Sequence, residues 1–138
     1  YASIYGHTKQ AAEELAALLE KKGCPEVTIT DLARDDMAEA VEDAFRYDRL
    51  VLATTTYNGD VFPFMREFIE SLTERNYQKR TIGLIENGSW AATAAKVMRQ
   101  LFEKSKEITF TETTVKIMSA LNEESTTQLE NLAEELCK

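Results

Sequence analysis

Apolar runs of strand length alternate with amphipathic helical stripes along most of this sequence of 138 residues. Residues 50–53 and 81–85 are almost continuously apolar, which is typical of strands that are buried on both faces of a parallel sheet. Apolar residues recur at helical spacing in the stretches 37–45, 65–72 and 91–102. This order of elements predicts an α/β fold in which helices cover both faces of a parallel sheet.

The outer parts of the sequence continue the same alternation. A helical stripe at residues 11–19 is closed by Gly23, and residues 27–30 are interpreted as a short strand. Two strand pieces are expected at 108–110 and 115–118, with an irregular polar interruption between them. An amphipathic helix then follows as the last element of the pattern.

Cap residues mark the expected helix starts. Asp35 and Asp36 precede the second helical stripe, and Pro63 suits the first turn of the third. Asn122 precedes the last stripe, whose first turn is acidic. These signals agree with the periodicity, because each falls where an apolar helical stripe is about to begin.

Composition narrows the classes of function. The chain carries 24 acidic and 16 basic residues, a net charge of −8, so a nucleic-acid or anionic-membrane partner is not expected. No apolar run approaches the roughly eighteen residues of a membrane span. Cys24 and Cys137 fit no metal-ligand spacing, and we expect two reduced thiols in a cytoplasmic protein. Because His7 is the single histidine and thiolate ligands are nearly absent, no metal centre is expected. The His7 imidazole has no visible partner that would orient it, so no catalytic side chain is expected.

Ligands of open parallel sheets bind beside the carboxyl ends of the strands, so the loops that follow strands are candidate sites. The first candidate loop leads directly into a helix and combines hydroxyl groups with a glycine. Backbone N–H groups at a helix start bind phosphate well, and neutral hydroxyls would complete such a cradle. A simpler interpretation is equally open for this loop alone, with Thr8 as a helix N-cap and Gly6 as a turn glycine. The candidate residues are Ser3, Ile4, Tyr5, Gly6, His7 and Thr8.

Two further loops carry the aromatic and amide groups that a flat ligand would need. Each follows one of the two apolar strands, and the only tryptophan lies in the second of them. A tryptophan at a loop tip favours stacking on a ring, although it also suits a lid over the protein's own core. Together with the phosphate cradle, these loops suggest a mononucleotide with a large ring system, namely FMN. Their residues are Thr55, Thr56, Tyr57, Asn58, Gly59, Glu86, Asn87, Gly88, Ser89 and Trp90.

The same loops resemble those of the flavodoxin-like domain of the flavodiiron proteins, or A-type flavoproteins. Residues 1–8 resemble the phosphate loop of that domain, 56–59 its second loop and 83–90 its third, and the resemblance covers nearly the whole chain. It implies a flavodoxin-like three-layer sandwich with a parallel sheet of order 2-1-3-4-5. It also implies noncovalent FMN and assigns residues 1–138 to a single FMN-binding domain.

The resemblance implies a role in electron transfer. In that family the domain follows a diiron metallo-β-lactamase-like module that reduces oxygen or nitric oxide. The flavin passes electrons to the iron pair from a rubredoxin-type or other redox donor. We therefore expect an oxidoreductase domain that is not catalytically complete alone, within a larger protein that forms a homo-oligomer.

Three features depart from the pattern of related proteins. Thr55 stands where the family commonly has proline, and Tyr5 replaces the small hydroxyl residue of simple flavodoxins, which favours the flavodiiron branch. Only Tyr1 and Ala2 precede the phosphate loop, so the central first strand is largely missing. We expect the chain to be a piece of a longer one, with the vacant place filled by further residues or by another molecule.

Two other functions share this sheet order. A flavodoxin-like NAD(P)H:quinone oxidoreductase has a similar phosphate loop, but its third loop is rich in histidine and glycine, whereas residues 86–90 here are Glu-Asn-Gly-Ser-Trp. A receiver-type signalling domain requires a phosphorylatable aspartate after the third strand. The corresponding residues here are Ala53, Thr54 and Thr55, which makes this second alternative remote.

Overall fold

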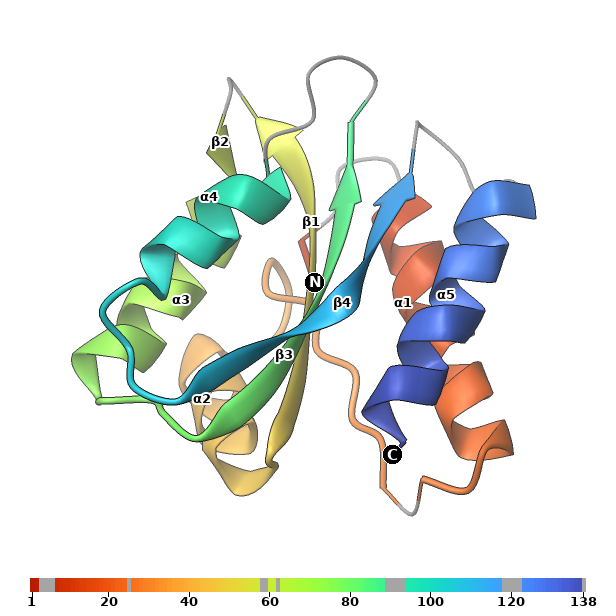
Figure 1. Ribbon diagram of the computed structural model, residues 1–138. Helices are drawn as coiled ribbons and strands as arrows, with labels where there is room; N and C mark the ends of the chain where they lie inside the picture. Colours follow the sequence, from red (N-terminus) through yellow and green to blue (C-terminus); the bar gives the residue numbers. More distant parts are fainter. Residues whose placement is uncertain are drawn as a thin grey trace.

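The computed structural model describes residues 1–2, 7–24, 26–57, 60–61, 63–88, 94–117 and 123–137, without the side chains of 56, 57, 60 and 61 (Figure 1). Helices and strands alternate along the chain, as the sequence predicts. The elements are α1 (His7–Lys21), α2 (Met37–Arg46), β1 (Arg49–Tyr57), β2 (Asp60–Val61), α3 (Pro63–Glu74), β3 (Arg80–Asn87), α4 (Ala94–Leu101), β4 (Ile108–Ile117) and α5 (Glu123–Leu136).

The predicted α/β architecture is confirmed. Strands β1, β3 and β4 are parallel neighbours in that order, and the β1–β3 register runs from Arg49↔Thr81 to Thr55↔Asn87. Figure 1 shows α1 and α5 on one face of the sheet, and α2, α3 and α4 on the other. The strands predicted at 50–53 and 81–85 therefore form the centre of a three-layer sandwich.

Alternate residues of the strands face two separate apolar cores. Leu52 and Leu84 lie in the core beneath α2, α3 and α4, whereas Ile85 lies in the core beneath α1 and α5. Gly83 allows α5 to approach this second face closely, because an added Cβ would lie 2.9 Å from a Leu132 side-chain carbon. The apolar runs of the sequence thus serve both faces of the sheet at once.

Most of the predicted helix boundaries are confirmed. Asp36 is the N-cap of α2 and accepts a 2.9 Å hydrogen bond from Ala38 N–H, whereas Asp35 accepts one from Asp31 N–H instead. Pro63 is the first residue of α3, and Gly23 ends α1 with a φ of +94°. The predicted cap at residue 122 lies outside the described residues.

The region predicted as two strand pieces near residue 110 is one strand, β4. Its interruption is a bulge, because the register passes from Ile82↔Phe110 to Leu84↔Thr114. Within the bulge, the Thr113 hydroxyl donates to Glu135 Oε1 at 2.6 Å. A side chain of α5 thus stabilises the polar stretch that interrupts the apolar pattern.

Residues 27–30 do not form the predicted strand. Among the described residues, only Tyr1 and Ala2 lie between this segment and β1, so the described part of the chain gives the segment no ladder partner along most of its length. Residues 1–2 keep part of the pairing expected for a central first strand. On one side, Ala2 N–H donates to Ala53 C=O of β1 at 3.0 Å, and on the other side Leu32 N–H donates to Tyr1 C=O at 3.0 Å. The predicted gap in the sheet is therefore present in the structure.

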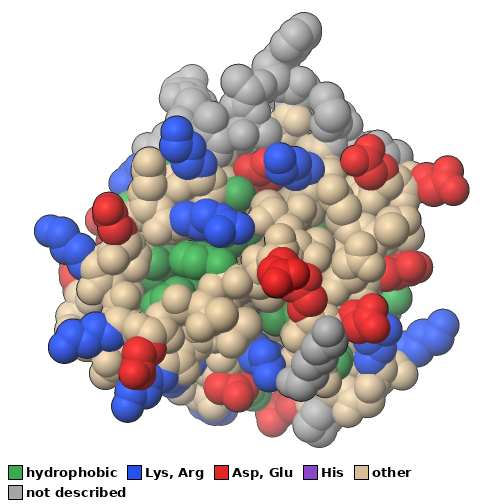
Figure 2. All heavy atoms as spheres, viewed as in Figure 1, with side chains coloured by type: hydrophobic (Ala, Val, Ile, Leu, Met, Phe, Trp, Pro, Cys, Tyr) green, Lys and Arg blue, Asp and Glu red, His purple; other side chains and the backbone are tan. Residues whose placement is uncertain are grey.

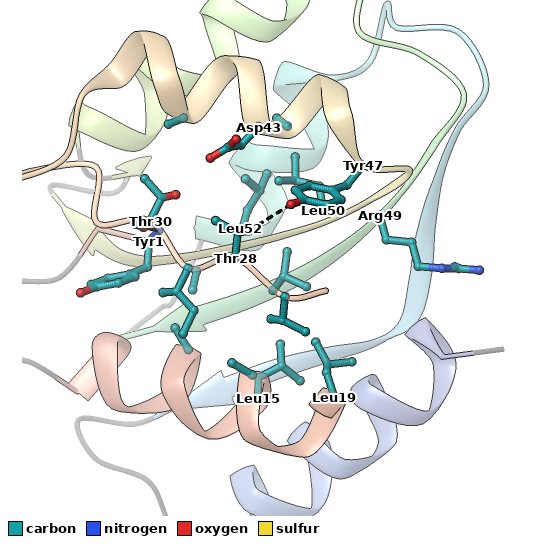
Figure 3. A pocket seen from close by; sticks show the side chains of 18 of the residues that line it. Tyr1, Leu15, Leu19, Thr28, Thr30, Asp43, Tyr47, Arg49, Leu50 and Leu52 are labelled. Carbon is teal, nitrogen blue, oxygen red and sulfur yellow. Dashed lines mark hydrogen bonds between the residues drawn. The ribbon is translucent and has the colours of Figure 1, made fainter. Parts of the chain in front are cut away.

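An apolar groove, the strand groove, occupies the place of the missing strand (Figure 3). It has a volume of about 440 Å³. Figure 3 shows side chains from β1, α1 and α2 around it, with the segment 26–30 between the helices. The strand groove is defined here by residues 26–30 and 49–53 together with Leu15, Leu19, Ala40 and Ala44.

The α-amine of Tyr1 lies at the end of the strand groove. It donates a 2.8 Å hydrogen bond to Thr30 C=O. Burial lowers its pKa from 8.0 to about 6, although the nearby carboxylates of Asp31 and Asp35 act in the opposite direction. The folded chain therefore favours the neutral amine near neutral pH.

For residues 1–138 prepared as a separate chain, we expect the free energy of unfolding to rise between pH 6 and pH 8. In this window the unfolded chain binds more protons at the Tyr1 amine than the folded chain does, so stability increases with pH. The difference between the two pKa values corresponds to at most about 2.7 kcal/mol. Urea unfolding at pH 6 and pH 8 measures the change in the free energy of unfolding, with an N-acetylated chain as the control. An unchanged pH dependence after acetylation would contradict the assignment to this amine.

Candidate cofactor site

The three predicted loops come after residues 1–2, after β1 and after β3 in the sequence. Figure 1 shows the carboxyl ends of β1 and β3 and the start of α1 at one edge of the sheet. The structure describes six of the sixteen predicted residues fully: His7, Thr8, Thr55, Glu86, Asn87 and Gly88. For Thr56 and Tyr57 it describes the backbone alone. The others lie outside the described residues: Ser3, Ile4, Tyr5, Gly6, Asn58, Gly59, Ser89 and Trp90.

The hydroxyl of Thr8 joins the bases of all three loops. Thr8 is fully buried as the second residue of α1, so it lies inside the helix and not at the N-cap position. Its Oγ1 is 3.4 Å from Thr55 Oγ1 and accepts a 3.3 Å hydrogen bond from Asn87 Nδ2. Residues from three distant parts of the sequence therefore meet at one polar point.

Neighbouring hydrogen bonds hold the strand ends around this point. Thr54, which is also fully buried, donates its hydroxyl to Thr55 C=O at 3.4 Å. Gly88 N–H donates to Ile117 C=O at 3.0 Å and attaches the start of the third loop to the end of β4. The edge is thus built on strand ends that are hydrogen-bonded to one another, which suits a ligand that must be held in one orientation.

Glu86 has a structural contact on the opposite face of the sheet. Its side chain is 4% exposed, and Oε2 accepts a 2.8 Å hydrogen bond from Ala95 N–H in the first turn of α4. Asn87, the next residue, points to the face of α1, as strand alternation requires. The carboxylate of Glu86 therefore stabilises the start of α4, and its predicted contact with a cofactor stays a prediction.

The first turn of α1 suits an anion. It contains no acidic residue, whereas the first turn of α5 contains Glu123 and Glu124. A helix N-terminus carries partial positive charge and unpaired N–H groups, which favour phosphate. The nearby side chains of Thr8 and Asn87 are neutral hydrogen-bonding groups, so the described residues fit the phosphate of a mononucleotide.

The strand groove is separate from this edge. Its described lining includes none of the predicted site residues.

Across the described ranges, no three His, Cys, Asp or Glu side chains come together as metal ligands would. Figure 2 shows acidic and basic side chains on the same face of the molecule. None of the described helices has the length and apolar character to cross a membrane.

The hairpin formed by β1 and β2 is the feature of the site that sequence reasoning missed. Thr56 pairs with Val61 and Tyr57 with Asp60, in antiparallel register, at the base of the second loop. The signal was present in the sequence, since the pair Asn-Gly at positions 58 and 59 is a strong sequence signal for a two-residue hairpin turn. The second loop is therefore shorter than the polar stretch from 54 to 63 suggests.

Comparisons with known proteins agree with this architecture. The sequence matches a family model described as a flavodoxin domain over residues 1–116. No curated protein matches the sequence significantly. Among solved structures, rubredoxin oxygen:oxidoreductase from the anaerobe Desulfovibrio gigas superposes with a TM-score of 0.91 at 17% identity. The match covers 99% of this chain and 34% of that enzyme, so the chain spans about a third of its length.

Two more structures extend the likeness. The flavodiiron protein from Giardia intestinalis gives a TM-score of 0.81 at 18% identity, with 99% of this chain and 34% of that chain covered. A flavodoxin from Streptococcus pneumoniae TIGR4 gives 0.74 at 26% identity, with 98% and 92% covered. The predicted resemblance to the flavodoxin-like domain of flavodiiron proteins is confirmed as a likeness of fold. Because the family model covers most of its length, the chain belongs to the flavodoxin domain family.

Proposed function

We propose that this domain binds FMN at the edge formed by the three loops and transfers electrons through it. The carrying observation is the buried Thr8 hydroxyl, which links the bases of all three loops through Thr55 and Asn87. Membership of the flavodoxin domain family supports a flavin as the ligand. When bound, the flavin supplies the one- and two-electron chemistry, and the protein supplies binding and orientation.

The roles of the residues follow from their chemistry. Main-chain N–H groups at residues 3–8 would hold the phosphate, with the Thr8 hydroxyl beside them. Residues 55–59 would meet the ring and its polar edge, and residues 86–90 would form the opposite wall. Neutral donors suit a phosphate that stays bound and is not transferred, which agrees with electron transfer as the task of the domain.

Replacing Thr8 by valine is expected to weaken FMN binding at least about tenfold, because a hydrogen bond to a charged group contributes about 1.5–3 kcal/mol. Quenching of FMN fluorescence on titration with the apo protein measures the affinity. Thr73→Val is the matched control: its hydroxyl donates to Glu70 C=O near the end of α3, away from the loops. An apo protein that quenches no flavin would refute the proposed cofactor. Equal affinities for the Thr8 and Thr73 variants would refute the proposed site.

We propose further that the domain works within a longer cytoplasmic protein. The likeness to flavodiiron structures, of which this chain spans about a third, supports a separate diiron metallo-β-lactamase-like module as the electron acceptor. That module would reduce oxygen or nitric oxide, and a rubredoxin-type or other donor would reduce the flavin. The full protein would be a homo-oligomer.

Anaerobic mixing tests this role against the quinone-reductase alternative. The FMN-loaded domain is expected to accept electrons from reduced rubredoxin. The change in flavin absorbance on reduction measures this transfer. It should oxidise NAD(P)H slowly when benzoquinone is the acceptor, because residues 86–90 differ from the loop rich in histidine and glycine that accepts a nicotinamide in the quinone reductases. Rapid turnover with NAD(P)H and benzoquinone would favour the oxidoreductase instead.

A further inference from the structure

The two cysteines of the chain meet although they are far apart in the sequence. Cys24 Sγ and Cys137 Sγ are 2.7 Å apart and separated by 113 residues. Both are half-buried free thiols, and the whole sequence contains no other cysteine. A disulfide bond is about 2.05 Å long, so a small movement of the side chains would bring the two sulfurs to bonding distance.

The packing of two helices creates this proximity. Helices α1 and α5 lie side by side on one face of the sheet, with their carboxyl ends at the edge opposite the carboxyl ends of β1 and β3 (Figure 1). Leu15 of α1 and Leu136 of α5 share one apolar core. Cys137 directly follows Leu136, and its N–H donates to Ala133 C=O at 3.1 Å, which continues the last turn of α5. The thiol of Cys137 is therefore held on the helix that packs against α1.

A glycine turn sets the position of Cys24. Gly23 N–H donates to Glu20 C=O at 3.1 Å and Cys24 N–H donates to Leu19 C=O at 3.0 Å, the two bonds of a Schellman motif. The motif requires the left-handed backbone of Gly23, whose φ is +94°. It turns the chain back at the end of α1, which places Cys24 beside the end of α5.

We propose that Cys24 and Cys137 form a reversible intramolecular disulfide when the chain meets a small-molecule disulfide such as oxidised glutathione. One thiolate attacks a sulfur of oxidised glutathione and releases one glutathione thiolate, which gives a mixed disulfide. The other cysteine thiolate attacks the protein sulfur of that mixed disulfide and releases the second glutathione thiolate. The two protons of the cysteine thiols pass to the two released glutathiones, so two thiols are oxidised and one disulfide is reduced.

The bond would connect the two helices next to the strand groove. Cys24 and Leu136 both line that groove. A crosslink at this point would fix the end of α1, from which the segment 26–30 leaves, against the end of α5. A hydrogen bond with Cys137 and then burial raise the pKa of the Cys24 thiol.

Oxidation of the purified chain tests the proposal directly. After incubation with oxidised glutathione, we expect no titratable thiol in denaturant and a monomer mass lower by two hydrogen atoms. The Tm is expected to rise by roughly 10 °C, because the crosslink closes a long loop in the unfolded chain. Dithiothreitol should reverse each change. Two remaining thiols, glutathione adducts alone or covalent dimers alone would each overturn the proposal.

Single variants separate the crosslink from other effects of the oxidant. Cys24→Ser and Cys137→Ser are expected to show no rise in Tm on oxidation, whereas a rise in either variant would assign the effect elsewhere. Gly23→Ala and Gly23→Asn test the turn, because Asn adopts the left-handed conformation more readily. The open space around Gly23 excludes a steric clash as the cause of any difference. We expect disulfide formation to slow at least about fivefold in the alanine variant and less in the asparagine variant.

Discussion

Five apolar residues joined to the amine of Tyr1 are expected to raise the free energy of unfolding by about 4 kcal/mol. Burial of each added side chain in the strand groove contributes about 2 kcal/mol, and ordering each residue costs about 1.5 kcal/mol. New main-chain hydrogen bonds to the edge of β1 add about 1 kcal/mol each for one or two bonds. For a domain of this size, the gain corresponds to a rise in Tm of roughly 15 °C.

The pairing of Ala2 with Thr54 shows where the added residues would lie. Ala2 is paired with Thr54 in parallel register, so five residues before Tyr1 would lie beside residues 48–52. Ala53 C=O already accepts a hydrogen bond on this side of β1. Because main-chain groups of alternate residues face the same edge, Val51 presents its N–H and C=O groups there too. The added strand would therefore meet both apolar walls and a ladder partner.

A second extension of equal length separates strand burial from simple removal of the charged amine. Alternating serine and glycine residues also convert the Tyr1 amine into an amide, but they supply almost no apolar surface. Urea unfolding of both extended chains at pH 8 measures the difference, and we expect the serine-glycine chain to gain less than about 1 kcal/mol. Equal stabilities would show that the strand groove does not accept a strand.

The groove also explains why one strand prediction was wrong while others were confirmed. Residues 50–53 and 81–85 form strands because their apolar side chains are buried on both faces and each has a paired neighbour. Residues 27–30 have suitable side chains for a strand, but pairing depends on a neighbour that lies elsewhere in the chain. The local sequence pattern therefore predicted the strands whose own apolar residues are buried in the sheet. It failed for residues 27–30, because strand formation there depends on a neighbouring strand that is largely missing.

Side-chain contacts between residues that are distant in the sequence could not be predicted from the local sequence pattern. Thr8 and Asn87 were predicted as site residues from their types and their places next to strand or helix ends, and their side chains do meet. The contact between Cys24 and Cys137 depends on how α1 packs against α5, for which the cysteine spacing gives no signal. Side-chain alternation along β3 did contain a signal for Glu86, because it places this residue on the same face as Leu84.

Replacing Glu86 by alanine is expected to lower the free energy of unfolding by about 3 kcal/mol. The change leaves the buried Ala95 N–H without its acceptor, which costs about 1–3 kcal/mol, and it also removes buried side-chain volume at the start of α4. Glu86→Gln keeps an acceptor oxygen at nearly the same position. We expect it to cost less than about 1.5 kcal/mol, as measured by urea unfolding.

The glutamine variant also separates the two roles considered for Glu86. If the carboxylate acts only by holding the first turn of α4, then Glu86→Gln should bind FMN within about threefold of the unchanged chain, because the helix start is preserved. If the carboxylate also contacts the cofactor, loss of its charge should change FMN affinity by about tenfold or more while stability changes little. Measuring both the stability and the FMN affinity of Glu86→Gln therefore distinguishes a residue that only supports the structure next to the third loop from one that binds the flavin.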